Sequence, residues 1–432
     1  MRTNTPPPPM KTKAEALAVV LAAAAEDVLP ETVPLALAPG RRLAADAAAE
    51  TDLPPFEKSS MDGYAVRSAD VVVAPVRLRV AGAVHAGETA DGPVTPGLTW
   101  KIMTGAPLPD GADAVVMVEE TEASPETGEV LIRKAARPGQ NVCRKGEDAR
   151  QGDVVVPAGT CLDAAALGLL ASVGCDPAPV FAAPSICVIP TGDELCPSNG
   201  PLPPRGSIRE SNGILLEAQI LAVSPALRVL RPGVARDDRA SLARFLEVGL
   251  AHDVLILSGG VSMGDLDLVG VALKDRGLEI LIEKVSIKPG KPLLFGRVKR
   301  ADGGRCTVFG LPGNPVSSFA TFELFVRPYL LRRLGDLDPY PDEVTAVLEH
   351  DGPLKVIPRT QHLPARLRAV DGVLRATPLR WNGSADLRGL VDADAFIIVS
   401  PDGPAPLPGD RVVVHRLPGK PLRASDRRAG RS

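Results

Sequence analysis

The fold is decided by the stretch Asp253-Val-Leu-Ile-Leu-Ser-Gly-Gly-Val-Ser-Met-Gly-Asp-Leu-Asp267. Its apolar run, Val254 to Leu257, is unbroken, which is typical of a strand buried on both faces of a parallel sheet. Gly259 and Gly260 follow directly, and glycines permit positive φ angles and let backbone N–H groups approach phosphate oxygens closely. The stretch therefore predicts a buried strand that delivers an anion-binding loop.

The polar side chains of this loop indicate what it binds. Ser258 and Ser262 supply hydroxyl groups, whereas Asp265 and Asp267 would repel a bare phosphate. Carboxylates beside an anion cradle indicate a divalent cation between them, and we expect Mg²⁺. Taken alone, the loop is also compatible with an ordinary glycine-rich turn that carries solvated aspartates.

Composition limits the function classes that need to be considered. The chain has 432 residues, of which 45% are hydrophobic, so it is long enough for several domains with their own cores. Nine Phe, three Tyr and two Trp are too few for extended base-stacking surfaces. The net charge of -3 gives no basic field, and no stretch has the length of a membrane span. We therefore expect neither nucleic acid nor a membrane as partner.

The cysteines and the N-terminal segment indicate a cytoplasmic protein. Six cysteines, at positions 143, 161, 175, 187, 196 and 306, show no metal-binding or disulfide spacing, so we expect reduced and mostly buried thiols. Lys11 to Ala25 is apolar enough to be compared with a signal peptide, but Glu15 interrupts it. Thr12 and Glu15 form a capping box, which predicts an amphipathic helix instead.

The pattern of apolar, glycine and proline residues changes several times along the chain. Short apolar runs broken by Gly and Pro predict β structure, and alternating strand and helix patterns after Pro184 predict an α/β domain. The segments that we expect are a disordered lead-in (1–10), an N-terminal helix and linker (11–50), a small β-rich domain (51–147), a β/helix connector (148–180), an α/β domain (181–334), a C-terminal β domain (335–418) and a basic tail (419–432).

Two polar turns stand out in the β-rich region. Ser59-Ser-Met-Asp62-Gly63 is a turn that delivers one carboxylate just before a strand, and Thr104 offers a hydroxyl beside Gly105. Each is common in ordinary turns, and from the turns alone that interpretation would prevail.

In the α/β region, three predicted strands end in short polar loops. They are Ile186 to Ile189, Val254 to Leu257 and Thr307 to Leu311. Ligands bind outside the carboxyl ends of strands in open parallel sheets, so we expect these loops to form one site. The acidic candidates are Glu194, Asp237, Asp265 and Asp267, and the basic ones are Lys284, Lys288 and Lys291. Glycine loops, lysines and carboxylates together suit phosphate-anhydride chemistry with Mg²⁺.

Seven ordered motifs also carry a family resemblance. They are Pro54-Pro-Phe-Glu-Lys-Ser-Ser-Met-Asp62-Gly-Tyr-Ala-Val-Arg67, Ile102-Met-Thr104-Gly-Ala-Pro107, Gly146-Glu-Asp148, Thr191-Gly-Asp-Glu194-Leu195, Ser258 to Asp267, Lys288-Pro-Gly-Lys291-Pro292 and Leu311-Pro-Gly-Asn-Pro-Val-Ser317. In this order they resemble the MoeA family, the molybdopterin molybdenumtransferases, and are similar also to the E domain of gephyrin. The likeness covers roughly residues 12 to 415.

The resemblance implies a fold and a reaction. The fold is a molybdopterin-binding, three-layer α/β domain with two β-rich domains and a C-terminal β-barrel-like domain. The reaction converts adenylylated molybdopterin and molybdate into molybdenum-loaded cofactor and AMP, with Mg²⁺. It also implies a homodimer with a shared active site, and a molybdopterin adenylyltransferase and molybdoenzyme maturation proteins as partners.

Carried over motif by motif, the resemblance assigns roles to residues. The catalytic set is Asp62, Thr104, Asp148, Glu194, Asp237 and Asp267, and Glu194, Asp237 and Asp267 are the metal candidates. The substrate-binding set is Ser258, Gly259, Gly260, Ser262, Lys284, Lys288, Lys291, Pro312, Gly313, Asn314, Ser317 and Ser384. The chain departs from the family around Trp381-Asn382-Gly383-Ser384, where Gln-Gly-Ser is usual.

Two other functions remain open at this stage. A non-catalytic scaffold that binds molybdopterin would need the pocket but not the carboxylates. A molybdopterin adenylyltransferase would need the α/β domain but not the β domain that carries Asp62 and Thr104.

Overall fold

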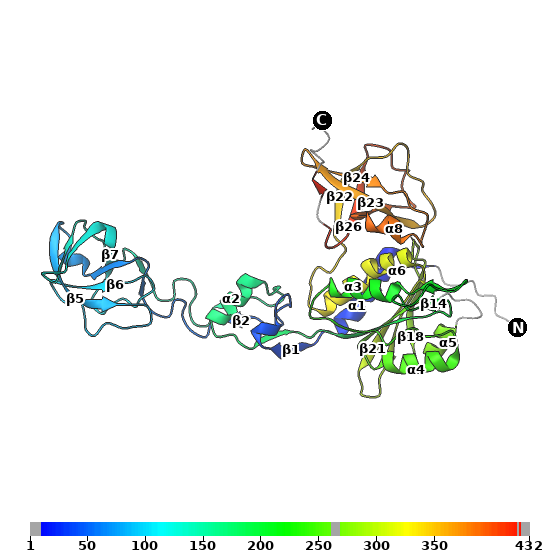
Figure 1. Cartoon of the computed structure of the whole chain (residues 1–432), viewed down its shortest axis with the longest axis horizontal. Helices are drawn as coiled ribbons and strands as arrows, with labels where there is room; N and C mark the ends of the chain where they lie inside the picture. The colour runs from blue at the N-terminus through cyan, green and yellow to red at the C-terminus, as the bar shows by residue number, and fades with distance from the viewer. Residues whose placement is uncertain (1–9, 261–267, 421–422, 425–432) are drawn as a thin grey trace. The chain divides into compact units, whose positions relative to one another are not determined.

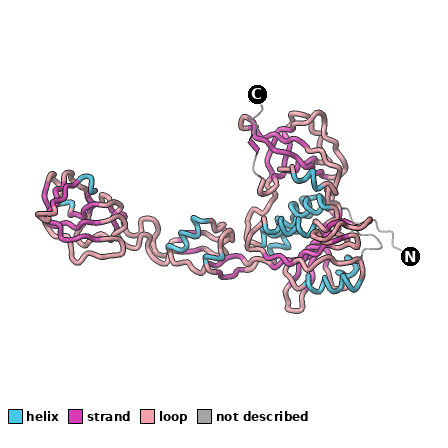
Figure 2. The backbone as a smooth tube through the Cα atoms, viewed as in Figure 1, coloured by secondary structure: helices cyan, strands magenta, loops and turns pink. Residues whose placement is uncertain are grey.

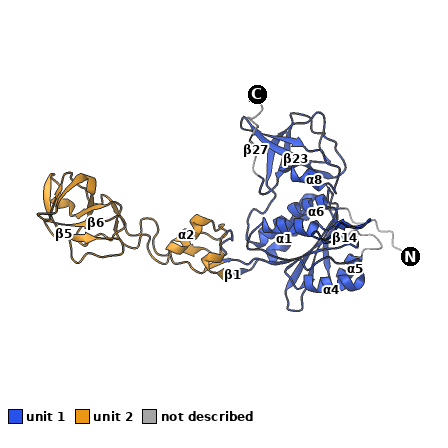
Figure 3. Ribbon diagram, in the orientation of Figure 1, with its two compact units in different colours: residues 1–31, 40–44, 180–432 blue, residues 32–39, 45–179 orange. Residues whose placement is uncertain are grey.

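The structure is a computed structural model that describes residues 10–260, 268–420 and 423–424. The chain forms two compact units, coloured separately in Figure 3. Unit 1 comprises residues 1–31, 40–44 and 180–432, and unit 2 comprises residues 32–39 and 45–179. The short strands β1 (Pro30–Val33) and β12 (Ala178–Phe181) each contain residues of both units.

A six-stranded sheet organises unit 1. Its strand order is β16-β13-β17-β21-β20-β18. The bounds are β13 Ser185–Pro190, β16 Arg228–Leu230, β17 Val254–Ser258, β18 Glu279–Lys284, β20 Pro292–Lys299 and β21 Arg305–Leu311. The first four strands are parallel, and β20 runs antiparallel to both of its neighbours, β21 and β18, so the sheet is mixed rather than wholly parallel. β17, the strand predicted from its apolar run, is buried throughout and lies between β13 and β21.

Helices cover both faces of this sheet, which confirms the predicted three-layer α/β domain. In Figure 1, α4 and α5 lie on one side of the sheet and α1, α3 and α6 on the other. The bounds are α1 Lys13–Glu26, α3 Asn212–Leu221, α4 Arg239–Leu250, α5 Leu268–Lys274, α6 Pro315–Thr321 and α7 Arg327–Arg333, with a π-helical turn, Phe322–Val326, between the last two. Two short strands, β14 (Leu195–Cys196) and β15 (Ile208–Arg209), pair beside the sheet.

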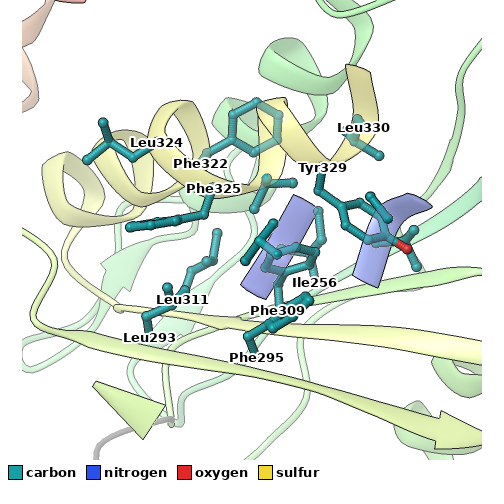
Figure 4. Packing of buried hydrophobic residues seen from close by; sticks show 14 of the residues in the cluster. Ile256, Leu293, Phe295, Phe309, Leu311, Phe322, Leu324, Phe325, Tyr329 and Leu330 are labelled. Atoms are coloured by element: carbon teal, nitrogen blue, oxygen red, sulfur yellow. The ribbon is translucent and has the colours of Figure 1, made fainter. Parts of the chain in front are cut away.

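Alternate residues of the central strands feed two separate cores. Ile256 packs toward α1, α3 and α7, whereas Leu255 and Leu257 pack toward α4 and α5. This two-sided burial explains why the strand sequence is apolar without alternation. On the first side, Phe295, Phe309 and Tyr329 form a cluster of aromatic rings beneath the π-helical turn (Figure 4).

The C-terminal part of unit 1 is a small closed barrel. Its strands are β22 Glu343–Leu348, β23 Thr360–Val370, β24 Val373–Pro378, β25 Ala395–Val399 and β26 Arg411–Arg416. Pairing runs β23-β24-β22-β26-β25, and β25 pairs back to β23, so the ring closes. This confirms the β-barrel-like domain. The short strands β19 (Ile287–Lys288) and β27 (Arg423–Ala424) add to β23, and α8 (Leu387–Val391) follows β24.

Unit 2 is β-rich (Figure 2). Its main sheet has the order β7-β4-β6-β5-β9-β8. The bounds are β4 Gly63–Val66, β5 Val76–Val84, β6 Leu98–Ile102, β7 Ala114–Met117, β8 Thr121–Ser124 and β9 Glu129–Ile132. Unit 2 also contains two short strand pairs, β2 (Ala47–Ala48) with β11 (Val154–Val156) and β3 (Lys58–Ser59) with β10 (Val142–Cys143). Its helices are α2 (Ala164–Ser172) and the short 3₁₀ helices Leu35–Leu37, Ser68–Asp70 and Val118–Glu120.

Several local predictions can be compared with these elements. The capping box of α1 is present, with Thr12 and Glu15 bonded to each other's backbone. β18 ends at Lys284, and the next strand, β19, pairs with β23 of the C-terminal sheet. All six cysteines are free, but only Cys187 and Cys306 are buried, so the expectation of mostly buried thiols is wrong. Within the described residues, no helix is long and apolar enough to cross a membrane.

Candidate functional site at the strand ends of unit 1

A cavity of about 1130 Å³ lies at the carboxyl ends of β13, β17 and β21, and we call it the strand-end cavity. Because these strands are parallel neighbours, the loops that follow them meet at one edge of the sheet. The predicted residues that the cavity brings together are Glu194, Asp237, Ser258, Gly259, Gly260, Lys288, Lys291, Pro312, Gly313, Asn314, Ser317 and Ser384.

Backbone hydrogen bonds tie the three loops to one another. The Thr191 N–H donates to the Ser258 carbonyl at 2.9 Å, and the Gly259 N–H donates to the Leu311 carbonyl at 3.1 Å. Gly260 has a φ of 61°, and a Cβ on it would lie 2.8 Å from Thr191 Oγ1. Glycine is therefore required there, because the loop packs directly on Thr191.

Asn212 is a cavity residue that the sequence did not identify. Ser211 is the N-cap residue of α3, and it makes no side-chain cap bond within the described residues. The Asn212 amide donates to Ser258 Oγ at 2.8 Å and to the Gly313 carbonyl at 2.7 Å. It joins the loops after β17 and β21, and its buried carbonyl oxygen has no hydrogen-bond partner among the described residues. An asparagine at a helix start gives no sequence signal that separates this role from capping.

Glu194 and Asp237 line the acidic side of the cavity, and Asp193 is a neighbour of Asp237. We call these three carboxylates the acidic group. The Asp237 N–H donates to Asp193 Oδ1 at 3.1 Å. The Asp237 side chain is exposed, but its partial desolvation raises its pKa, and the negative charges of Asp193 and Glu194 raise it further. Asp238, the next residue, caps α4 through its bond to the Ser241 N–H, which leaves Asp237 for the cavity. The described residues contain no group of three His, Cys, Asp or Glu placed to hold a metal ion.

The basic side of the cavity is a turn that carries Lys288 and Lys291. At its centre, Gly290 has a φ of 103°, and a Cβ there would approach Thr321 of α6 to 2.6 Å. Lys284 is exposed in β18, and it is not among the described residues that line the cavity. Arg209 and Arg359 do line it, although the sequence pattern did not single them out.

Ser384 belongs to the cavity through the C-terminal barrel. Asn314 donates from its side chain to Ser384 Oγ at 3.0 Å, and the Val316 N–H at the start of α6 donates to the Ser384 carbonyl at 3.0 Å. The segment 381–387 thereby lies along the cavity wall, and it includes Trp381.

Unit 2 holds a second polar site. Asp62 Oδ1 accepts hydrogen bonds from both the N–H and the hydroxyl of Thr104, each at 2.7 Å, and we call this arrangement the Asp62–Thr104 pair. These bonds lower the pKa of Asp62. Gly63 follows, and a Cβ on it would lie 2.0 Å from the Val116 carbonyl oxygen, so the turn depends on this glycine. Asp148 is exposed elsewhere in unit 2, and in the described structure no hydrogen bond joins its carboxylate to this pair.

Three predicted residues of the loop after β17, Ser262, Asp265 and Asp267, lie outside the described residues. The predicted lead-in (1–10) and basic tail (419–432) also lie mostly outside them.

Comparisons with known proteins agree with this architecture. Residues 11–174 match the family model "MoeA N-terminal region (domain I and II)", residues 187–332 match "Probable molybdopterin binding domain", and residues 354–417 match "MoeA C-terminal region (domain IV)". A Bacillus subtilis protein named molybdopterin molybdenumtransferase is 36% identical over 366 residues, which are 83% of each chain. The chain belongs to the MoeA family.

Further relatives extend the likeness. A Mycobacterium tuberculosis protein named molybdopterin molybdenumtransferase 2 is 40% identical over 74% of this chain and 79% of its own length. The crystal structure of a MoeA protein from Pyrococcus horikosii is 34% identical, covers 94% of this chain and 99% of its own, and superimposes with a TM-score of 0.77. The MoeA resemblance predicted from the seven motifs is thus confirmed.

Proposed function

We propose that this protein transfers molybdenum from molybdate into adenylylated molybdopterin and releases AMP. Relatives that align with 74% and 83% of the chain carry the name molybdopterin molybdenumtransferase. The observation that carries the proposal is the strand-end cavity, which combines Lys288 and Lys291 with Glu194 and Asp237 at one sheet edge. Such a set suits cleavage of a phosphate anhydride, because cations stabilise charge on the departing phosphate.

The acidic group fits Mg²⁺ as the cofactor. Mg²⁺ prefers oxygen ligands, and a cation beside Asp237 would offset the partial desolvation and the negative neighbours that raise the pKa of this carboxyl group. Glu194 and Asp237, together with Asp267 outside the described residues, would hold the ion. When bound, Mg²⁺ supplies neutralising charge to the pyrophosphate of the substrate.

The remaining residues receive roles that follow from their chemistry. Lys288 and Lys291 bind the phosphates and stabilise the AMP phosphate as it leaves. Thr104 and neighbouring amides position molybdate, and Asp62 fixes the Thr104 hydroxyl. We propose a homodimer with shared active sites, to which Asp62, Thr104 and Asp148 contribute. The protein is proposed to act in the cytoplasm, between a molybdopterin adenylyltransferase and molybdoenzyme maturation proteins.

The test is AMP release from adenylylated molybdopterin by the purified protein, measured with and without molybdate and Mg²⁺. Release that requires both ions is the expected result. Chromatography of the product should also show that one molybdenum is bound for each AMP released. Size-exclusion chromatography with light scattering tests the dimer separately.

Two other outcomes of this assay would replace the proposal. Tight binding of the nucleotide without release, in the presence of both ions, would identify a molybdopterin-binding scaffold. Consumption of ATP with molybdopterin, and none of the adenylylated form, would identify an adenylyltransferase.

A further inference from the structure

The strand-end cavity is lined by glycine, proline, polar, charged and aliphatic residues, together with one tryptophan. Of the described residues that line the strand-end cavity, Trp381 is the only aromatic one. The whole chain has two tryptophans, and the other, Trp100, lies in the core of unit 2 with 7% of its surface exposed. Trp381, by contrast, is only partly buried and lines the cavity.

The loop that carries Trp381 is held at both ends. Asp386 accepts hydrogen bonds from the N–H groups of Asn382, at 2.9 Å, and Gly389, at 3.2 Å. A Cβ on Gly389 would lie 3.1 Å from the Trp381 Cβ, so this glycine lets the base of the indole side chain pack on α8. These contacts fix the Trp381 backbone before any ligand arrives.

The same loop is also attached to the α/β domain. Ser384 joins Asn314 and Val316 at the start of α6, as described above. The Trp381 segment is therefore tied to the loop after β21, and both line the same cavity as the turn of Lys288 and Lys291. A loop held in this way loses little backbone entropy when its side chain meets a planar ligand.

We propose that Trp381 determines substrate affinity by stacking on a planar heteroaromatic ring held in the strand-end cavity. The inference rests on the proposed function, because the substrate then carries two such rings, an adenine and a pterin, joined by a pyrophosphate. Stacking of an aromatic side chain on a base is typically worth a loss of about tenfold or more in affinity when the ring is removed. The cations of the cavity bind the phosphates, and Trp381 adds the selection for an attached ring.

The experiment uses the intrinsic fluorescence of the full-length protein. Wild type is titrated with AMP, with a free pterin, and with ribose 5-phosphate, which keeps the sugar and phosphate but has no ring. We expect quenching by AMP or by the pterin and none by ribose 5-phosphate. The ligand that quenches identifies which ring lies on Trp381, since the two sources have the same stacking chemistry.

Three variants separate stacking from packing. W381F keeps an aromatic face and should bind the quenching ligand within about threefold of wild type by calorimetry, while the ligand-induced fluorescence change disappears because only Trp100 remains. W381L keeps apolar bulk against Gly389 but has no π face, and W381A has neither. Both should weaken binding about tenfold and raise the KM of adenylylated molybdopterin similarly, with kcat changed much less.

The outcomes are decisive in both directions. Equal dissociation constants for wild type, W381F and W381L, or no quenching by either ring, would overturn the inference. If the wild type releases AMP and W381L has an unchanged KM, the stacking inference is overturned while the proposed function stands. Ring binding that depends on Trp381 in a protein without AMP release would instead refute the proposed function alone.

Discussion

The Asp62–Thr104 pair of unit 2 and the acidic group of unit 1 are two carboxylate sites with opposite electrostatics. Asp62 accepts two hydrogen bonds from Thr104, which lower its pKa although the side chain is exposed. Asp237 is also exposed, but partial desolvation and the negative charges of Asp193 and Glu194 raise its pKa. One carboxylate is stabilised as an anion by the protein itself, and the other is not.

This difference in electrostatics indicates whether each carboxylate site would be stabilised by a bound cation. The charge on Asp62 is satisfied by donors from its own unit, so this site is complete and presents a fixed anion and hydroxyl. The charge on Asp237 is opposed by its surroundings, so that site gains most from a bound cation. The same comparison extends to polar groups in the strand-end cavity, where the buried Thr191 Oγ1 and Asn212 Oδ1 have no hydrogen-bond partner in the part of the chain that the structure describes.

The largest effect is expected from D237N. The substitution removes a negative charge at the proposed Mg²⁺ site while keeping the size of the side chain. We expect AMP release to fall by about 100-fold or more, the loss typical of removing one preorganised electrostatic group, with a higher Mg²⁺ requirement. The measurement is the rate of AMP release as a function of Mg²⁺ concentration.

The neighbouring residue offers a matched control for this prediction. Asp238 caps α4 rather than lining the cavity, and Asn is an equally good N-cap, so D238N should leave the rate unchanged. Full activity in D237N, or an equal loss in D238N, would contradict the assignment of the acidic group as a cation site.

A smaller effect is expected at the complete site. T104V removes the hydroxyl donor to Asp62 and leaves the backbone donor, so the pKa of Asp62 should rise toward its usual value. Loss of a hydrogen bond to a charged group should lower AMP release by roughly tenfold. T104S restores the hydroxyl and should recover most of the rate. A T104S variant as slow as T104V would show that the methyl group, and not the hydroxyl, matters.

The two carboxylates should also affect stability with opposite signs. The folded-state pKa of Asp62 is lowered, so its contribution is present above the unfolded value, about 3.9, and is lost as pH falls through the folded value. The folded-state pKa of Asp237 is raised, so its contribution is present below about 3.9 and is lost as pH rises through the folded value. At neutral pH without Mg²⁺, D237N should therefore melt higher than wild type and D62N lower.

Thermal melting from about pH 3 to pH 7 checks this prediction, with unfolded reference values taken from ordinary carboxyl groups. The melting difference between wild type and D237N should shrink as pH falls. The melting difference between wild type and D62N should shrink only at the acid end of this pH range. Differences of the same sign for both variants at pH 7 would remove the contrast between the two sites.

Much of the fold followed from patterns that report burial. The apolar run Val254 to Leu257 predicted a strand covered on both faces, and the Thr12–Glu15 capping box predicted the start of α1. The antiparallel direction of β20 was not predicted, because a strand's direction depends on its pairing partners and leaves little trace in its own residues. The pairing of β19 with the distant β23 was not predicted either, because it depends on tertiary contacts.

For the site, the sequence predicted which residues take part better than it predicted which residues contact one another. Glycine loops and charged residues after strands can be recognised locally, and the three strand ends did meet at one cavity. Asn212, Arg209, Arg359 and Trp381 were missed as cavity residues because each comes from an ordinary helix start, strand end or loop. Only tertiary packing brings them to the strand ends.

The smallest effect, at Thr191, tests whether the strand-end cavity is incomplete beyond its carboxylates. Thr191 is 3% exposed, and its hydroxyl has no partner in the described structure. A buried hydroxyl without a hydrogen bond costs free energy, so T191V, which replaces it with a methyl group of similar shape, should change the free energy of unfolding by about 1 kcal/mol or less, in the stabilising direction. S258A removes a hydroxyl that accepts from Asn212 and should instead destabilise by about 1 kcal/mol. The measurement is denaturant unfolding of both variants. If T191V destabilises as much as S258A, the Thr191 hydroxyl already has a hydrogen-bond partner. The contrast between the unit 2 site and the strand-end cavity would then rest on the acidic group alone.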